Sequence, residues 1–371
     1  MDRGPDRVAA TAQLLWAAAK PTPDPAAVLA AVDAGADLDE AAIGAWSRRV
    51  GPLFWRAMQA ADLTTAISEQ IVRALRNDVA VRRCQEELLL PEALRLIVGP
   101  LTEAGFEPLL FKGPAIARLY PEPGLRPMDD IDVILPPAQY QAALAGLRHA
   151  GWVDVEDRPG DHYDTYLLHQ RVPDLPLELH RDLATRGERS NRLRGEDLWN
   201  LRRPGECFGA RAYVLPPEED LVALAAHAAK PFHNFERLIW SVDFAVVIQS
   251  TTLDWDRVAA FARRNACSTA LAVSLRNAAR LGAEVPAELC VIKGGAARLA
   301  ALEPVLDPRW TMTEVEPGVK HRLRYALSDG RASRASLLAG EVFAKGPLHA
   351  PGKAIGLTRL AVRQWRRLRR R

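Results

Sequence analysis

Two short strand-like segments stand out from a chain whose pattern is otherwise mostly helical. PLLFKG (108–113) is a brief apolar run ended by glycine, and DIDVILPP (130–137) alternates acids with β-branched residues. Between them, PAIARLY begins with Pro114, a residue that suits the first turn of a helix. A strand, a helix and a second strand in close succession predict a small α/β unit here.

Further strand and helix signals follow this segment. AQYQAALAGLRHAG (138–151) predicts a helix that stops at its final glycine, and WVDVE (152–156) predicts a strand. PLELH (176–180) offers another short strand. The α/β unit therefore continues well beyond the first two strands.

Helical patterns flank this unit on both sides. Before it, residues 8–105 are rich in alanine and leucine, and the apolar positions 90, 94, 97 and 101 repeat as one face of a helix. Pro91 and Pro100 predict a boundary or kink near each proline. After it, from Pro217 onward, four helical segments follow one another.

The size of the chain, 371 residues, predicts two or three structural units with a sizeable core, and its 48% hydrophobic and 26% charged residues are typical of globular proteins. We expect an N-terminal helical region at 1–90, an α/β core at 91–215, a C-terminal helical domain at 216–305, and a helical or loosely packed extension with a basic tail at 306–371.

Cysteine usage and hydropathy predict the cellular compartment of the protein. The four cysteines lie far apart without a CxxC pair, so they suggest neither a zinc site nor a disulfide framework. The N-terminus does not resemble a full signal peptide, and no apolar run reaches the roughly 18 residues of a membrane span. We expect a cytoplasmic protein without a transmembrane segment.

The net charge of +3 depends on the C-terminal end of the chain. The last nine residues hold six arginines and no acids, so the balance without them is +3 − 6 = −3. The body is therefore mildly acidic. The arginine-rich tail either contacts an anionic surface, such as a membrane or a nucleic acid, or is a solvated end.

The residues that carry chemistry cluster in the first strand, helix and second strand. Asp130 and Asp132 project from one face because strand side chains alternate with period two, and such a carboxylate pair suits Mg²⁺. Gly113 lets the backbone approach an anion, and the helix that follows it offers N–H groups to a phosphate. Lys112 and Arg126 add positive charge. This combination is typical of phosphoryl transfer.

The segment LLFKGPAIARLYPEPGLRPMDDIDVILPP resembles the DNA polymerase β type nucleotidyltransferase superfamily and, more narrowly, a bacterial group of uncharacterised nucleotidyltransferases. LELH (177–180) and HAAKPFHNFERLIWSVDFAVV (227–247) are similar to the same group, so the resemblance covers roughly residues 30–280. It implies an α+β fold: a polymerase β type core, made of a small mixed sheet with helices, flanked by N- and C-terminal helical regions.

The resemblance also implies roles for individual residues. Asp130, Asp132 and Glu178 become catalytic metal ligands, Gly113 becomes the phosphate-loop glycine, and Lys112 contacts the triphosphate. With Arg126, two further residues are expected at the nucleotide. His180 shares the face of Glu178 and either reaches the substrate or forms a structural hydrogen bond, and Lys230 contacts phosphate.

The implied reaction transfers a nucleoside monophosphate from a nucleoside triphosphate such as ATP to an acceptor hydroxyl, with Mg²⁺ or Mn²⁺ as cofactor and pyrophosphate as product. The acceptor stays open between a protein or peptide, RNA and a small molecule. The alternative is a catalytically silent nucleotide-binding or scaffold protein. Three acids held in mutual repulsion argue against that alternative.

Overall fold

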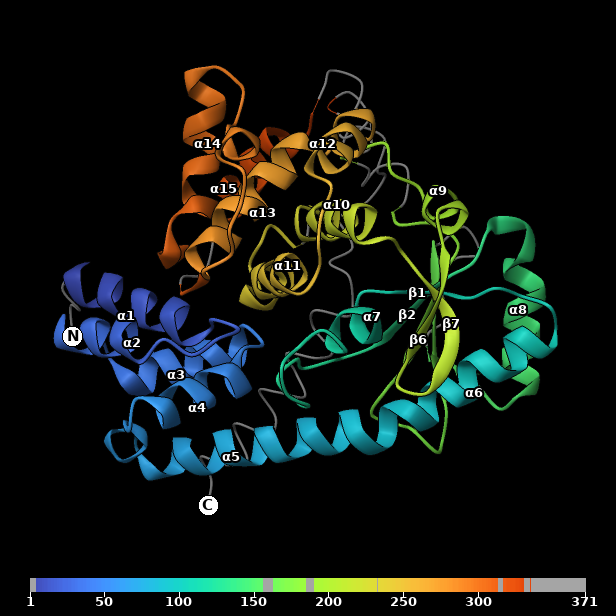
Figure 1. The fold of residues 1–371 in the computed structure, drawn as a ribbon, viewed down its shortest axis with the longest axis horizontal. Coiled ribbons are helices and arrows are strands. Elements are labelled where there is room, and N and C mark those ends of the chain that lie inside the picture. The colour runs from blue at the N-terminus through green and yellow to red at the C-terminus, as the bar shows by residue number, and fades with distance from the viewer. Residues whose placement is uncertain are drawn as a thin grey trace.

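The computed structural model of the chain describes residues 5–155, 163–184, 190–231, 233–312, 316–329 and 334 (Figure 1). The arginine-rich tail and most of the extension after residue 306 therefore lie outside the described residues. Within the described ranges, helical regions stand on both sides of a mixed β-sheet in chain order, as the α+β expectation requires.

The helices that precede the sheet are α1 (Pro5–Ala18), α2 (Pro25–Asp33), α3 (Leu38–Ser47), α4 (Gly51–Ala60), η1 (Thr64–Ala66), α5 (Glu69–Cys84), η2 (Gln85–Leu89) and α6 (Leu90–Glu103). Those within the core are α7 (Gly113–Ala117), α8 (Pro137–His149) and α9 (Gly195–Asn200). The helices that follow it are α10 (Pro217–Ala228), α11 (Leu238–Ser250), α12 (Trp255–Arg264), α13 (Ser268–Arg280), η4 (Ala287–Cys290), α14 (Ala296–Leu306), η5 (Pro308–Thr311) and α15 (Pro317–Leu327).

The sheet has seven strands in the order β3-β4-β5-β2-β1-β7-β6. Their bounds are β1 (Leu109–Phe111), β2 (Ile131–Ile134), β3 (Val153–Asp154), β4 (Asp164–Leu168), β5 (Leu177–His180), β6 (Arg203–Cys207) and β7 (Ala210–Val214). The central strand β2 pairs antiparallel with β1 and parallel with β5. The two acid-bearing segments that the sequence predicted as strands, 130–137 and 176–180, therefore lie side by side.

The two faces of the sheet belong to two different apolar cores. One face packs with α6 and α8, and it is lined by Leu110, Ile131, Val133, Leu177 and Leu179. The other face packs with α10 and α11, through Leu109, Phe111 and Ile134. Figure 1 shows α8 on the side of the sheet away from α10 and α11. Asp132 and Glu178 alternate with the first set, so they point toward the helices α10 and α11.

Neither Pro91 nor Pro100 interrupts the run of helical residues before the sheet with a loop. Near Pro91 the path passes through the π-helical turn η2, where the Leu90 N–H donates to the Gln85 carbonyl five residues back. This wider turn suits a proline, which has no N–H to donate. Pro100 lies inside α6, and the helix continues to Glu103, so the boundary comes one turn later than the proline suggests.

Three strands have no counterpart among the predicted elements. β4 follows the expected strand at 152–156, which itself shortens to the two residues of β3. β6 and β7 form an antiparallel hairpin that joins the sheet through β1. Because Pro204 and Gly205 lie in β6, the sequence does not have a strand pattern there. β6 is an edge strand, where both residues are tolerated.

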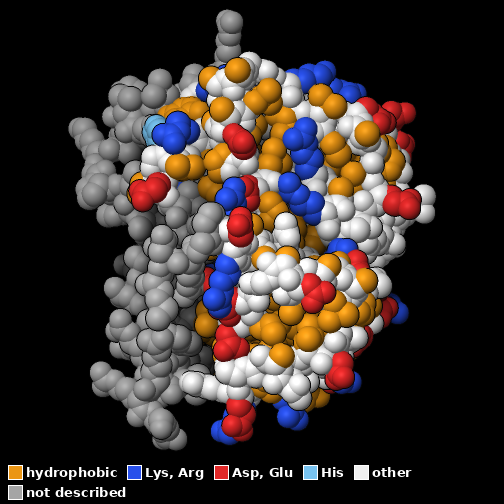
Figure 2. Space-filling view, turned by 90° about the vertical axis from the view of Figure 1, so that its left-hand side faces the viewer, with side chains coloured by type: hydrophobic (Ala, Val, Ile, Leu, Met, Phe, Trp, Pro, Cys, Tyr) orange, Lys and Arg blue, Asp and Glu red, His pale blue; other side chains and the backbone are white. Residues whose placement is uncertain are grey.

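Among the residues that the structure describes, no helix is long and apolar enough to cross a membrane. Figure 2 views the side on which the N-terminal helices lie, and acidic, basic and apolar side chains are interspersed over it. This face therefore carries no broad field of a single sign, in keeping with the small net charge of the body.

Candidate active site

The parallel pairing of β2 with β5 brings three buried polar side chains together. Asp132 of β2 lies opposite Glu178 of the parallel strand β5, and His180 follows two residues later on the same face. All three residues are at most 6% exposed. Each offers one ligand atom, and these atoms lie within 4.8 Å of one another. Two carboxylates and an imidazole are thus held at one place by the sheet itself.

Asp132 is the centre of this group. One of its oxygens, Oδ1, lies 2.8 Å from the Lys112 ammonium and accepts a hydrogen bond of 2.8 Å from His180 Nε2. Burial alone would raise the pKa of Asp132, but the charge of Lys112 and the bond from His180 outweigh it. The pKa is therefore held well below its usual range, and the carboxylate is ionised at neutral pH.

Lys112 reaches Asp132 from the end of β1 with an unusual backbone. Its φ of 56° and ψ of −131° lie in a region that side chains rarely adopt, and it caps the five-residue helix α7. Its ammonium also lies 3.5 Å from His227 Nδ1 of α10. Burial, followed by the charge of Lys112, lowers the pKa of His227 well below its usual value, so the imidazole is neutral and accepts from the lysine.

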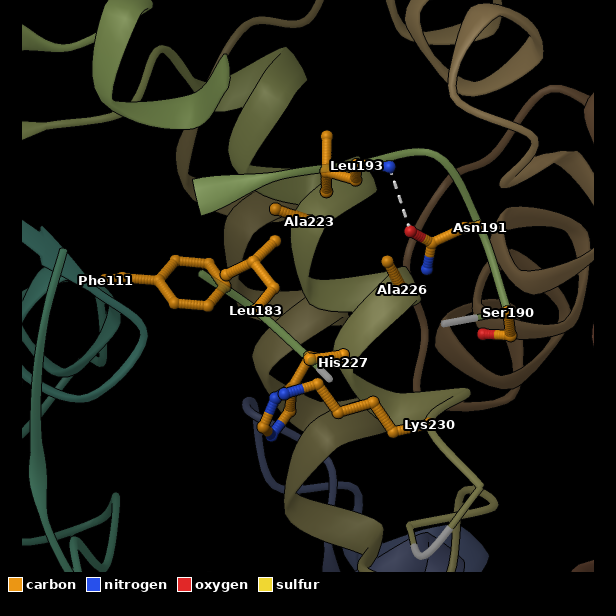
Figure 3. Close-up of a pocket in the computed structure, with 10 residues that line it drawn as sticks. Phe111, Leu183, Ser190, Asn191, Leu193, Ala223, Ala226, His227 and Lys230 are labelled. Atoms are coloured by element: carbon orange, nitrogen blue, oxygen red, sulfur yellow. Dashed lines mark hydrogen bonds between the residues drawn. The ribbon is translucent and has the colours of Figure 1, made fainter. Parts of the chain in front are cut away.

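A pocket opens beside Lys112 (Figure 3). The empty space in and in front of it, open solvent included, is about 380 Å³. Its apolar lining consists of Phe111, Leu183, Ala184, Leu193, Ala223 and Ala226. Its polar lining consists of Ser190, Asn191, His227 and Lys230. Figure 3 shows His227 of α10 and Lys230, two residues after that helix, on the same side of the pocket. His227 thus separates the pocket from the Lys112–Asp132 pair.

Asp130 and Gly113, two further residues of the motif, are not part of this group. Asp130 comes directly before β2 and is half-buried, and it does not belong to the group of two acids and one histidine whose ligand atoms converge. A Cβ added at Gly113 would lie 3.4 Å from the Asp130 carbonyl oxygen, an ordinary contact. Gly113 therefore leaves room within the fold for a small side chain, and its role toward an anion stays a prediction.

Arg126 lies in a buried ion pair. Its Nε and one terminal nitrogen each lie 2.8 Å from a different oxygen of Asp243 in α11, and the Tyr120 hydroxyl donates to the same carboxylate at 2.7 Å. Arg126 ties the loop before β2 to the C-terminal helices. Its expected contact with a nucleotide stays a prediction.

Two more charged residues of the motif region have defined neighbours. Lys230 lies over the ring of Tyr163 at 5.4 Å, beside the pocket. Asp129 pairs with Arg49 at 2.6 Å and with Arg237 at 3.4 Å. The extra acid before Asp130 is therefore neutralised by the helical regions on both sides, and Lys230 is the cation that faces the pocket together with His227.

The donor set fits a divalent cation. Carboxylate oxygens and imidazole nitrogen are ordinary metal ligands, and the Lys112 ammonium at 2.8 Å from Asp132 shows that this carboxylate holds a positive charge. Sequence reasoning missed His227 and the acid behind His180, Asp164. His227 lies in a segment singled out only by its resemblance, and Asp164 lies in a strand that was not predicted.

Comparison with curated proteins and with solved structures gives no match. A family model described as uncharacterised nucleotidyltransferase matches residues 35–283, which is more than half of the chain and includes every residue of the group above. The match also spans the pocket and most of the flanking helices. With its seven-stranded mixed sheet between helical regions, this chain belongs to the family of uncharacterised nucleotidyltransferases.

Proposed function

We propose that this protein transfers a nucleoside monophosphate from a nucleoside triphosphate to an acceptor hydroxyl and releases pyrophosphate, with Mg²⁺ or Mn²⁺ as cofactor. The observation that carries the proposal is the convergence of Asp132, Glu178 and His180 within 4.8 Å, beside a lysine at the end of β1. Membership of a nucleotidyltransferase family supports the same reaction class.

Asp132 and Glu178 would hold the divalent ion, with Asp130 as a further carboxylate at the open end of β2. When bound, such an ion neutralises triphosphate oxygens and lowers the pKa of the attacking hydroxyl. Lys112 releases Asp132 and turns its ammonium to the phosphates. The acceptor oxygen then attacks the α-phosphorus, and the bond to the β-phosphate breaks, with its electron pair leaving on pyrophosphate. Glu178 takes up the hydroxyl proton.

The pocket would receive the nucleoside portion of the substrate. It is apolar on one wall and carries Lys230 and neutral His227 on the other, and it lies one side chain away from the carboxylates. A planar base suits an apolar wall with a few polar groups, as in most small-molecule sites. Arg126, through its ion pair with Asp243, would act mainly by fixing the loop that carries Asp130.

The test is to incubate the pure protein with each labelled nucleoside triphosphate, Mg²⁺ or Mn²⁺ and a cell extract, and to measure which fraction gains label. Label in protein, RNA or small molecules names the acceptor class. Asp132→Asn should lower the rate at least about a thousandfold, because several kcal/mol of charge stabilisation are lost. Asp154→Asn, the same change at an exposed acid of β3, is the matched control.

Full activity of a pure Asp132→Asn protein would show that this group is not the active site. Binding of metal and nucleotide without any transfer, across all extracts and triphosphates, would instead establish the silent nucleotide-binding alternative. Because Asp132 is buried between Lys112 and His180, the variant should also be checked for native unfolding temperature, so that loss of fold is not taken for loss of chemistry.

A further inference from the structure

The group of Asp132, Glu178 and His180 contains one nitrogen ligand atom in addition to the carboxylate oxygens. His180 Nε2 lies 2.8 Å from Asp132 Oδ1 and 3.4 Å from Glu178 Oε2. In an octahedral centre with ligands at about 2.1 Å, adjacent ligand atoms are about 3 Å apart. The separations of the imidazole nitrogen from the two carboxylate oxygens are therefore close to those of adjacent ligands around one ion, and all three ligand atoms lie within 4.8 Å of one another.

A third acid, Asp164, lies on the other side of the imidazole. The other ring nitrogen, Nδ1, lies 4.0 Å from Asp164 Oδ2, and β4 and β5 pair these two residues directly. Both side chains are at most 5% exposed. In the described part of the chain Nδ1 has no hydrogen-bond partner. Histidines that bind metals usually donate their second N–H to a carboxylate, so Asp164 stands where that carboxylate is needed.

We propose that His180 is a direct nitrogen ligand of the metal centre and that the centre prefers a first-row transition ion, such as Mn²⁺, to Mg²⁺. Coordination through Nε2 places the ring proton on Nδ1, toward Asp164. Mg²⁺ takes oxygen ligands almost exclusively, whereas imidazole suits transition ions, so one nitrogen in three ligands shifts the selectivity. This inference rests on the proposed function for the ion's use in transfer.

The experiment follows Mn²⁺ by electron paramagnetic resonance, without nucleotide. Pulsed spectra of the wild-type protein should show a directly bound nitrogen, and the coupling should change when the protein is labelled with [¹⁵N]histidine. Mg²⁺ competition should give an affinity at least about tenfold below that of Mn²⁺. These two measurements need no variant and do not depend on turnover.

Variants then assign the nitrogen. His180→Gln should lose the coupling and weaken Mn²⁺ binding about 10- to 100-fold, with a smaller loss for Mg²⁺. Asp164→Asn should keep the coupling and weaken Mn²⁺ binding by a similar factor. His149→Gln, at the exposed end of α8, should change neither quantity.

Two outcomes overturn the inference. If Mn²⁺ binds without nitrogen coupling, or if Mg²⁺ binds as tightly as Mn²⁺, His180 only orients Asp132. In that case labelled transfer with Mg²⁺ still supports the proposed function. If neither ion binds with or without nucleoside triphosphate and no label is transferred, both the inference and the proposed function fall.

Discussion

At the residue scale, the site is built from a few side chains whose positions follow from strand register. Asp132 and Glu178 lie together because β2 and β5 are parallel and paired in register. Period-two alternation in the sequence predicted a shared face for Asp130 with Asp132 and for Glu178 with His180. The ligand atoms of Asp132 and Glu178 lie within 4.8 Å of each other, close enough for both carboxylates to contact one ion. The catalytic roles of both residues stay predictions, and mutation separates them.

Glu178→Gln keeps the shape of the side chain and removes its negative charge. We expect nucleotide binding to be retained and turnover to fall by about two to four orders of magnitude, the range for loss of a positioned base. Calorimetry with the triphosphate and the label-transfer assay measure the two quantities. An unchanged turnover would leave Glu178 as an ordinary buried strand residue.

Removing the Lys112 ammonium should change metal affinity and the rate of transfer in opposite directions. Without it, the ammonium no longer competes for Asp132 Oδ1, and Mn²⁺ binding in the absence of nucleotide should tighten roughly 10- to 100-fold, the value of one hydrogen bond to a charged group. Transfer should nevertheless fall, because the cation for the triphosphate is lost. Lys112→Met tests both effects. An unchanged metal affinity would show that Lys112 does not occupy the position that the ion takes.

At the element scale, the sequence predicted those elements whose apolar residues repeat over several turns or along a buried strand. α10 to α13 are examples, and their buried faces supply much of one core. It could not predict the β6–β7 hairpin, because β6 is mostly exposed and carries Pro204 and Gly205. The π-helical turn η2 was equally hidden, yet Gln85 within it donates to the Met128 carbonyl, two residues before Asp130.

The helix α10 also carries a buried acid with a consequence for stability. Burial raises the pKa of Asp220 to about 7, because the attraction of Arg118 offsets it only in part. The folded state therefore binds more protons than the unfolded state between about pH 4 and pH 7. Stability should fall as the pH rises through that window and become level above it.

Asp220→Asn should remove this slope and stabilise the protein at pH 8, by up to about 4 kcal/mol. Urea unfolding at pH 5 and pH 8 measures the difference. Asp33→Asn at the exposed end of α2 is the matched control and should leave the slope in place. A slope that survives in the Asp220 variant would assign it to other groups.

At the scale of the whole molecule, the N-terminal helices are fastened to the C-terminal ones by side chains that bond to backbone. Arg48 donates to the carbonyl oxygens of Thr311 and Glu236, at 2.6 and 3.1 Å. Within the C-terminal part, the Trp310 indole donates to the Asn234 carbonyl at 2.8 Å. Residues far apart in sequence thus share one core, which no local pattern could have predicted.

Arg48→Ala should destabilise the protein by about 1–3 kcal/mol, because two carbonyl groups at this interface lose a charged donor. Chemical unfolding of the full chain measures the change. Arg73→Ala is the matched control, since that arginine lies on α5 with its side chain 75% exposed and pairs with Glu69. The control should change stability by less than about 0.5 kcal/mol. Equal effects of the two variants would contradict a special role for Arg48.

The hydrogen bonds of Trp16 in α1 can form only late in synthesis of the chain. Its indole donates to the Pro308 carbonyl and to the Thr311 hydroxyl, so its partners are translated 292 and 295 residues later. At about 5–20 residues per second, a ribosome needs roughly a quarter of a minute to a minute to reach them. Throughout that interval the Trp16 indole lacks its hydrogen-bond partners Pro308 and Thr311. A chaperone that binds α1 would therefore act until the last helices have been synthesised.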